Sequence, residues 1–121
     1  MSKPSAAPQQ EIRNHRRVPL EVEVSMSSES QFFAGITGNI SEGGLFVCTY
    51  QRLAIDQRVE INLVLESGDS ISAQGRVRWV REASDHACPG IGIEFDEIDP
   101  GALSAIDRFC SARPPMYMEL D

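Results

Sequence analysis

The chain has 121 residues, a formal net charge of −7, and ordinary proportions of apolar (41%) and charged (24%) residues. This length predicts one domain, and the composition excludes a wholly disordered protein. No apolar run approaches the ~20 residues of a membrane helix, and the first residues lack the apolar segment of a signal peptide. The negative charge opposes binding to nucleic acid or to an anionic membrane. We therefore expect a cytoplasmic protein that neither binds nucleic acid nor inserts into a membrane.

The N-terminal region divides into two parts. Residues 1–10 are mainly Pro, Ser, Ala and Gln, and they predict a disordered segment. The lead-in over residues 11–17 contains Arg13, Arg16 and Arg17. A small basic patch on an otherwise acidic chain indicates a compact anion as the partner, because a long polyanion would be repelled by the remaining surface.

Alternation of apolar and polar residues predicts six strands. In the second strand, Gly35 and Gly38 are expected to mark bends or bulges. In the fifth, Val77 and Trp79 are expected on one face, and Arg76 and Arg78 on the other. The six expected strands cover residues 18–26, 31–40, 45–49, 58–66, 71–79 and 90–96.

A helix is expected after the last strand, because Asp99 can cap it and Pro100 suits its first position. Leu103, Ile106, Phe109 and Cys110 recur at helical spacing, so one apolar stripe should lie across the sheet or close a barrel opening. Residues 113–121 form a C-terminal tail. Six amphipathic strands without a βαβ repeat predict an all-β fold, a six-stranded antiparallel β-barrel with this single C-terminal helix.

The cysteines are Cys48, Cys88 and Cys110, an odd number at wide spacing, and no Cys/His ligand pattern accompanies them. We expect three buried, reduced thiols and no metal site. No nucleophile elbow, Walker loop or dinucleotide fingerprint occurs, and both histidines are isolated. The chain is therefore not expected to be an enzyme, and no catalytic residues are predicted.

The stretch Asn39–Gly44, which reads Asn-Ile-Ser-Glu-Gly-Gly, resembles a strand-end turn that faces a ligand. Asn39 and Ser41 can form hydrogen bonds, and Gly43 and Gly44 allow positive φ and close approach. Arginine pairs bidentately with phosphate, matches the O6/N7 edge of guanine and stacks on purines. The ligand that would use all three modes is a guanine nucleotide with exposed phosphates. From these residues alone, however, a solvated basic segment beside an ordinary hairpin is the favoured interpretation.

Two half-motifs in order, Arg13-x-x-x-Arg17 and Asn39-x-Ser41-x-x-Gly44, resemble the PilZ domain. The similarity continues through residues 44–47, 75–80 and 90–95 to the closing helix, and it spans residues 11–112. PilZ domains are six-stranded antiparallel barrels with a helix, and many are receptors for cyclic di-GMP. Three departures are Ile12, where many members carry a further arginine, Arg16, which adds a charge at an internal position that varies in the family, and Asn39, where the motif can carry Asp.

The resemblance implies that the arginines grip phosphates and guanine bases, that Asn39 and Ser41 contact a guanine, and that Gly44 shapes the turn. Ligand binding would order the N-terminal arginine segment and relay the signal to an unidentified effector protein, with cyclic di-GMP as ligand and no cofactor. The candidate ligand-binding residues are Arg13, Arg16, Arg17, Asn39, Ser41, Gly43, Gly44 and Arg78.

Two other functions are alternatives for this chain. One is a nucleotide-independent adaptor that acts by protein–protein interaction in motility or polarity control. The other is a barrel that binds single-stranded nucleic acid, which requires a basic face with exposed aromatic side chains. The acidic balance and an aromatic content of 7% oppose it.

Overall fold

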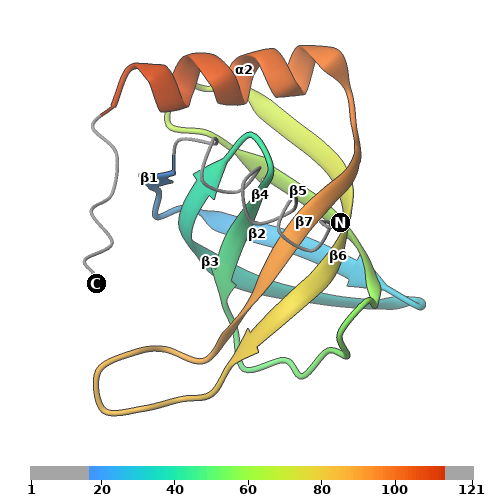
Figure 1. The fold of residues 1–121 in the computed structure, drawn as a ribbon. Helices are drawn as coiled ribbons and strands as arrows, with labels where there is room; N and C mark the ends of the chain where they lie inside the picture. Colours follow the sequence, from blue (N-terminus) through green and yellow to red (C-terminus); the bar gives the residue numbers. More distant parts are fainter. Residues whose placement is uncertain (1–16, 114–121) are drawn as a thin grey trace, which may run out of the picture.

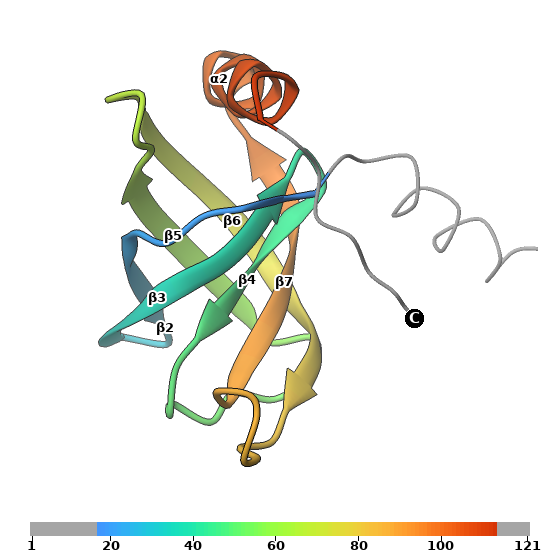
Figure 2. The same cartoon turned by 90° about the vertical axis from the view of Figure 1, so that its left-hand side faces the viewer.

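This computed structural model describes residues 17–113. Within them, apolar residues alternate with polar ones along antiparallel strands, so that one face of the sheet is buried. The strand order β1-β3-β2-β5-β6-β7-β4 closes into a barrel because β3 also pairs with β4. The predicted six-stranded antiparallel barrel with one C-terminal helix is confirmed, and the short β1 is an extra strand (Figures 1 and 2). The strands are β1 (Val18–Pro19), β2 (Glu23–Ser28), β3 (Gln31–Ser41), β4 (Gly44–Cys48), β5 (Arg58–Val64), β6 (Ser70–Arg81) and β7 (Gly90–Ile98).

The barrel interior is filled by every second residue of the strands, as the alternation predicted. Burying each large aliphatic side chain contributes roughly 1.5–3 kcal/mol, so these residues hold the barrel closed. The fully buried members include Val24, Met26, Ile40, Leu45, Val47, Ile61, Ile71 and Ile91.

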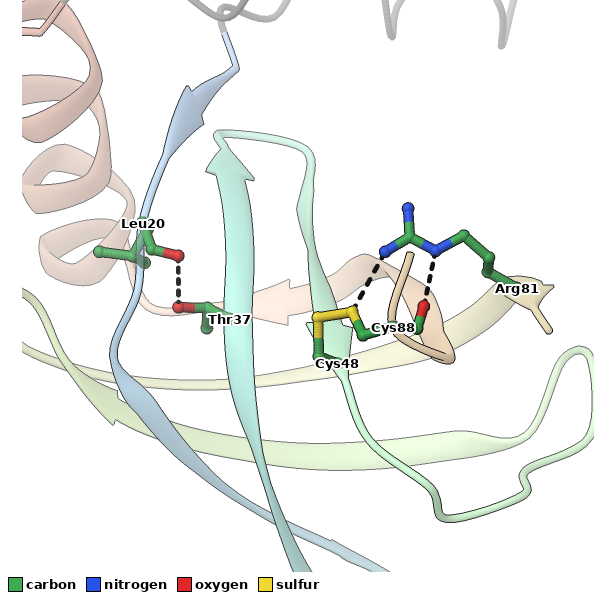
Figure 3. The surroundings of a disulfide bond; sticks show 5 residues. All are labelled: Leu20, Thr37, Cys48, Arg81 and Cys88. Atoms are coloured by element: carbon green, nitrogen blue, oxygen red, sulfur yellow. Dashed lines mark hydrogen bonds between the residues drawn. A yellow bond between two sulfur atoms is a disulfide. The ribbon is translucent and has the colours of Figure 1, made fainter. Parts of the chain in front are cut away.

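The expected first strand over residues 18–26 is broken into β1 and β2. Val18 pairs with Ile40 near the end of β3, whereas Glu23 pairs with Ile36 nearer its middle. The side chain of buried Thr37 bridges the break: its hydroxyl donates to the Leu20 carbonyl at 2.9 Å and accepts from the Val22 amide at 2.9 Å. The first of these bonds is visible in Figure 3. The backbone groups of Leu20 and Val22 at the break therefore form hydrogen bonds although the β-sheet pairing is interrupted there.

Two of the three register shifts among the described strands change which side chains face outward near the β3–β4 turn. In β3 the register shifts between Thr37 and Asn39, which confirms the bulge expected at Gly38. In β6 the register shifts between Val77 and Trp79, so Arg78 is an extra residue there. The prediction that Val77 and Trp79 share a face is wrong, since Val77 lies in the core and Trp79 faces outward, 48% exposed. A bulge places two successive side chains against one partner residue, and this re-aims the second of them.

The helix α2 (Pro100–Ser111) lies across one end of the barrel, beside the β3–β4 turn (Figures 1 and 2). The Asp99 side chain caps it by accepting a hydrogen bond from the Gly101 amide at 2.9 Å, as expected. Leu103 was predicted in the apolar stripe but is 37% exposed, so that prediction is wrong. The residues that face the barrel are Ala102, Ala105, Ile106, Phe109 and Cys110.

No helix within residues 17–113 has the length and apolar character needed to cross a bilayer.

The expectation of three buried, reduced thiols is wrong for two of the cysteines. Cys48, the last residue of β4, forms a disulfide with Cys88 in the loop before β7. Both residues are only partly buried. Cys110 of α2 lies outside this disulfide and is buried, as predicted. The pairing depends on β4 and β7 being neighbours, since Cys48 is opposite Gly90.

Candidate ligand-binding site

Arg17 meets the β3–β4 turn through its side chain. The β1–β3 pairing brings the residue before Val18 to the end of β3. The Arg17 guanidinium donates from Nε to Asn39 Oδ1 at 2.8 Å and from one terminal nitrogen to Ser41 Oγ at 3.1 Å. Three of the predicted site residues therefore lie in one hydrogen-bonded group.

The charge of Arg17 has no anionic partner in the described part of the chain. Ion pairs between residues 17 and 113 involve other arginines, and the second terminal nitrogen of Arg17 makes no hydrogen bond to a described residue. Burial lowers the pKa of Arg17, an effect partly opposed by the nearby Cys110 thiol. An arginine nevertheless keeps its proton in a protein. This is a partly buried cation held by neutral oxygens, which suits an incoming anion.

The turn after Ser41 is held against β7. The Ser41 hydroxyl accepts from the Gly43 amide at 3.1 Å, and the Gly43 carbonyl accepts from the Phe95 amide at 2.9 Å. A Cβ on Gly44 would collide with the Ile93 carbonyl, so only glycine allows this approach of β4 to β7. Gly44 therefore permits the close contact between β4 and β7, whereas the approach of the turn backbone to a ligand stays a prediction. Neither Gly43 nor Gly44 has the positive φ that glycine allows.

Glu42, at the tip of the same turn, contacts the helix. Its carboxyl group shares a hydrogen bond with Asp107 of α2, and this bond, together with desolvation and the charge of Asp107, raises the pKa of Glu42. The turn that carries Asn39 and Ser41 is thereby linked to α2.

Arg78 lies on the same outer surface but is already paired. It forms ion pairs with Glu94, at 2.6 Å, and with Asp56. The hydrogen bond to Glu94 is the main cause of the raised pKa of Arg78. Glu94 separates Arg78 from the turn, since Glu94 is the partner of Gly44 on β4. Arg13 and Arg16 lie outside the described residues.

An outward-facing aromatic pair beside this group was not predicted. Phe46 is opposite Asn39 on one side and Gly92 on the other, and Gly92 is opposite Trp79. The Phe46 and Trp79 rings stack with centroids 5.0 Å apart, and Trp79 lies so close to Gly92 that a Cβ there would collide with the indole. A signal was present in the sequence, because the two glycines of Gly90-x-Gly92 leave room for rings on the sheet.

The sequence model of the PilZ domain matches residues 11–112 of this chain. The chain belongs to the PilZ domain family. PilZ domains are non-enzymatic, which agrees with the prediction that this chain is not an enzyme. A comparison with curated proteins finds no match.

Solved structures resemble this PilZ domain in fold. The Bacillus subtilis inhibitor of motility MotI/DgrA aligns with a TM-score of 0.73 and 20% identity, over 83% of this chain and 50% of that one. The PilZ domain of CeSA from a cellulose-synthesizing bacterium aligns with a TM-score of 0.56 and 22% identity, over 79% of this chain and 95% of that one. The PilZ domain of Escherichia coli YcgR, solved with c-di-GMP, aligns with a TM-score of 0.63 and 13% identity, over 83% of this chain and 89% of that one. This chain thus spans half the length of the Bacillus subtilis protein.

A surface hollow of this PilZ domain offers a contrasting environment. It lies over β5, β6 and the end of β7, and it is lined by Glu60, Glu97 and Asp99 together with neutral residues. Carboxylates repel phosphate, so an anionic ligand is favoured at Arg17 and not in this hollow. Within residues 17–113, no group of three or more His, Cys, Asp or Glu side chains is arranged to hold a metal ion.

Proposed function

We propose that this PilZ domain is a non-enzymatic receptor for cyclic di-GMP. The observation that carries the proposal is the partly buried Arg17 guanidinium, whose partners among residues 17–113 are the neutral oxygens of Asn39 and Ser41. A buried charge without a counter-charge is costly. A phosphate would supply that counter-charge and accept short, charge-assisted hydrogen bonds.

The surroundings of Arg17 support a nucleotide as the source of the phosphate. The half-buried amide of Asn39 can bond the polar edge of a guanine, and the exposed ring of Trp79 offers a face on which a base can stack. Ser41 is fully buried, so its hydroxyl would reach a guanine only if Arg17 moved aside. Arg78 would take part only if it exchanged Glu94 or Asp56 for the ligand. The proposed ligand residues are Arg13, Arg16, Arg17, Asn39, Ser41, Gly43, Gly44 and Arg78, together with Trp79.

The proposed output passes through a partner protein. Residues 11–16 directly precede Arg17 and β1, so arginines that close over a nucleotide would order this segment and change the surface a partner contacts. The proposal places the protein in the cytoplasm, where a nucleotide second messenger is read. It needs no cofactor.

Exposed apolar side chains favour a second candidate, a nucleotide-independent adaptor in motility or polarity control. Phe32 is 84% exposed and Ile36 42% exposed, and both project outward from β3. Exposed apolar surface of this kind is typical of protein-binding faces. The fold shared with an inhibitor of motility is compatible with this candidate.

Isothermal calorimetry with purified protein and cyclic di-GMP separates the two candidates. Wild-type protein is expected to bind, and Arg17→Ala to weaken binding at least about tenfold, because a hydrogen bond to a charged group contributes ~1.5–3 kcal/mol. Arg17→Lys should restore little of this loss, since an ammonium lacks the guanidinium fork.

Arg58→Ala is the matched control, because it removes an exposed arginine whose hydrogen bond, to Gln74, lies away from the turn. This variant should bind as the wild type does. Circular dichroism melts confirm that each variant is folded. Absence of binding heat from folded wild-type protein at high micromolar ligand would reject the receptor and leave the adaptor.

A further inference from the structure

A disulfide joins the far end of β4 to the loop before β7. Cys48 and Cys88 are 40 residues apart in sequence, and their bond joins the end of the loop 82–89 to the end of β4 (Figure 3). Both cysteines are partly exposed, so a thiol from solution can reach the bond. The reactivity of a disulfide toward exchange depends on such access.

Arg81 connects the disulfide to the outward aromatic pair. Its Nε donates to the Cys88 carbonyl at 2.9 Å, and a terminal nitrogen contacts Cys88 Sγ at 3.2 Å (Figure 3). The same guanidinium lies over the Phe46 ring, 4.2 Å from its centroid, and Phe46 stacks on Trp79. Contacts therefore run without a gap from Cys88 through Arg81 and Phe46 to Trp79.

The disulfide and the candidate nucleotide site occupy opposite ends of one strand. β4 begins at Gly44, beside Ser41, and ends at Cys48, so about 13 Å separates the two ends at ~3.3 Å per residue. Phe46 lies midway along β4 and is opposite Asn39. The aromatic stack is thus the direct structural connection between them.

We propose that Cys48–Cys88 is a thiol–disulfide exchange site whose redox state sets the geometry of the Phe46–Trp79 stack and, through it, nucleotide affinity. The effect on nucleotide affinity and the cytoplasmic redox environment rest on the function proposed above. Disulfides of cytosolic proteins are usually transient and redox-sensing, so in the proposed location the bond would alternate between two states.

The exchange is balanced with a dithiol as the reductant. One thiolate of the dithiol attacks a sulfur of the bond and forms a mixed disulfide, and its second thiolate then releases the other cysteine. Cys48 and Cys88 gain two electrons and two protons, and the dithiol becomes a disulfide. The barrel remains closed, because the pairing of Cys48 with Gly90 and the hydrogen bond from the Thr49 amide to the Pro89 carbonyl, at 3.0 Å, do not involve sulfur.

The chain contains one tryptophan, so Trp79 fluorescence reports on the stack without labelling. Protein equilibrated in oxidised glutathione is compared with protein reduced by dithiothreitol, and a thiol titration in denaturant checks each state. Reduction is expected to raise the constant for acrylamide quenching of Trp79 roughly twofold, as the stack loosens. It should weaken cyclic di-GMP binding by a similar, roughly twofold or greater factor.

The double variant Cys48→Ser/Cys88→Ser should match the reduced protein and be insensitive to dithiothreitol. Cys110→Ala should keep the wild-type redox response. Formation of no disulfide in oxidised glutathione, or identical Trp79 quenching in both states, would overturn the proposal. Equal nucleotide affinity in the two states would overturn its regulatory part. A Trp79 response in a protein that binds no cyclic di-GMP supports the exchange site and rejects the receptor function instead.

Discussion

Arg17 keeps a positive charge in a partly buried place, where its described partners are neutral. Burial lowers the pKa of its guanidinium, but the uncharged form of arginine is out of reach near neutral pH. The hydrogen bonds to Asn39 and Ser41 fix its direction without neutralising its charge. An anion bound there, as proposed, would meet a side chain that is already oriented, and its binding would lose less side-chain entropy than with a mobile arginine.

Glu42 makes the stability of the folded protein depend on pH. Its hydrogen bond to Asp107 raises the pKa of Glu42 in the folded protein above the ordinary 4.5. The folded state then binds the proton more tightly than the unfolded state does, so this group stabilises the protein at low pH. Its contribution is lost as the pH rises from about 4.5 through the raised pKa.

We expect Glu42→Gln to remove the loss of stability that accompanies rising pH, because the amide cannot ionise beside Asp107. The free energy of unfolding at neutral pH should rise by a few tenths of a kcal/mol, the size typical of surface charge pairs. Urea unfolding from pH 4.5 to 7.5 measures it. Glu60→Gln, on the exposed side of β5, is the control. A pH slope in Glu42→Gln equal to that of the wild type would contradict the assignment.

At the scale of elements, the strands follow local sequence, whereas the bulges do not. Alternation correctly predicted the buried positions of β5, because Val59, Ile61 and Leu63 all face the same core, whereas Val64 at its end is exposed. The bulge at Arg78 was not predicted, because Val77-Arg-Trp79 continues an apolar alternation. The bulge accompanies the pairing of Trp79 with Gly92 on β7 and the stacking of Trp79 on the Phe46 ring of β4. A single strand's sequence does not contain that information.

Replacement of Gly92 by alanine tests how β7 supports the aromatic pair. The new Cβ would collide with the Trp79 indole, which is half-exposed and can swing into solvent. We expect a red shift of Trp79 emission and a loss of about 1 kcal/mol in unfolding free energy, the value of one aromatic stack.

Gly44→Ala provides the comparison, because its Cβ would meet the backbone carbonyl of Ile93, which cannot move aside. That variant should lose more stability, about 1–3 kcal/mol or above, with little change in Trp79 emission. Equal losses, or unchanged emission in Gly92→Ala, would show that the indole does not rest on β7.

At the scale of the whole molecule, the candidate site was predictable because its two parts are short motifs. Arg17, Asn39 and Ser41 were identified from residue type and order, and the β1–β3 pairing brings them together. The disulfide was not predictable in this way. It joins residues 40 apart in sequence, and only the closure of the barrel through β4 and β7 makes them neighbours.

The same sequence separation predicts how much the disulfide stabilises the protein. Closing a loop of this length lowers the chain entropy of the unfolded state by an amount equivalent to about 4 kcal/mol. Domains typically have a free energy of unfolding of about 5–15 kcal/mol, so the reduced protein should remain folded but have a measurably lower free energy of unfolding. We expect reduction to lower the urea midpoint while the far-ultraviolet circular dichroism of the β-barrel is retained. Cys48→Ser/Cys88→Ser should unfold at the midpoint of the reduced protein with or without dithiothreitol. If the reduced wild type is as stable as the oxidised form, the predicted entropic stabilisation is absent. Either residual contacts between β4 and β7 already restrict the unfolded chain, or the bond destabilises the native barrel by an equal amount.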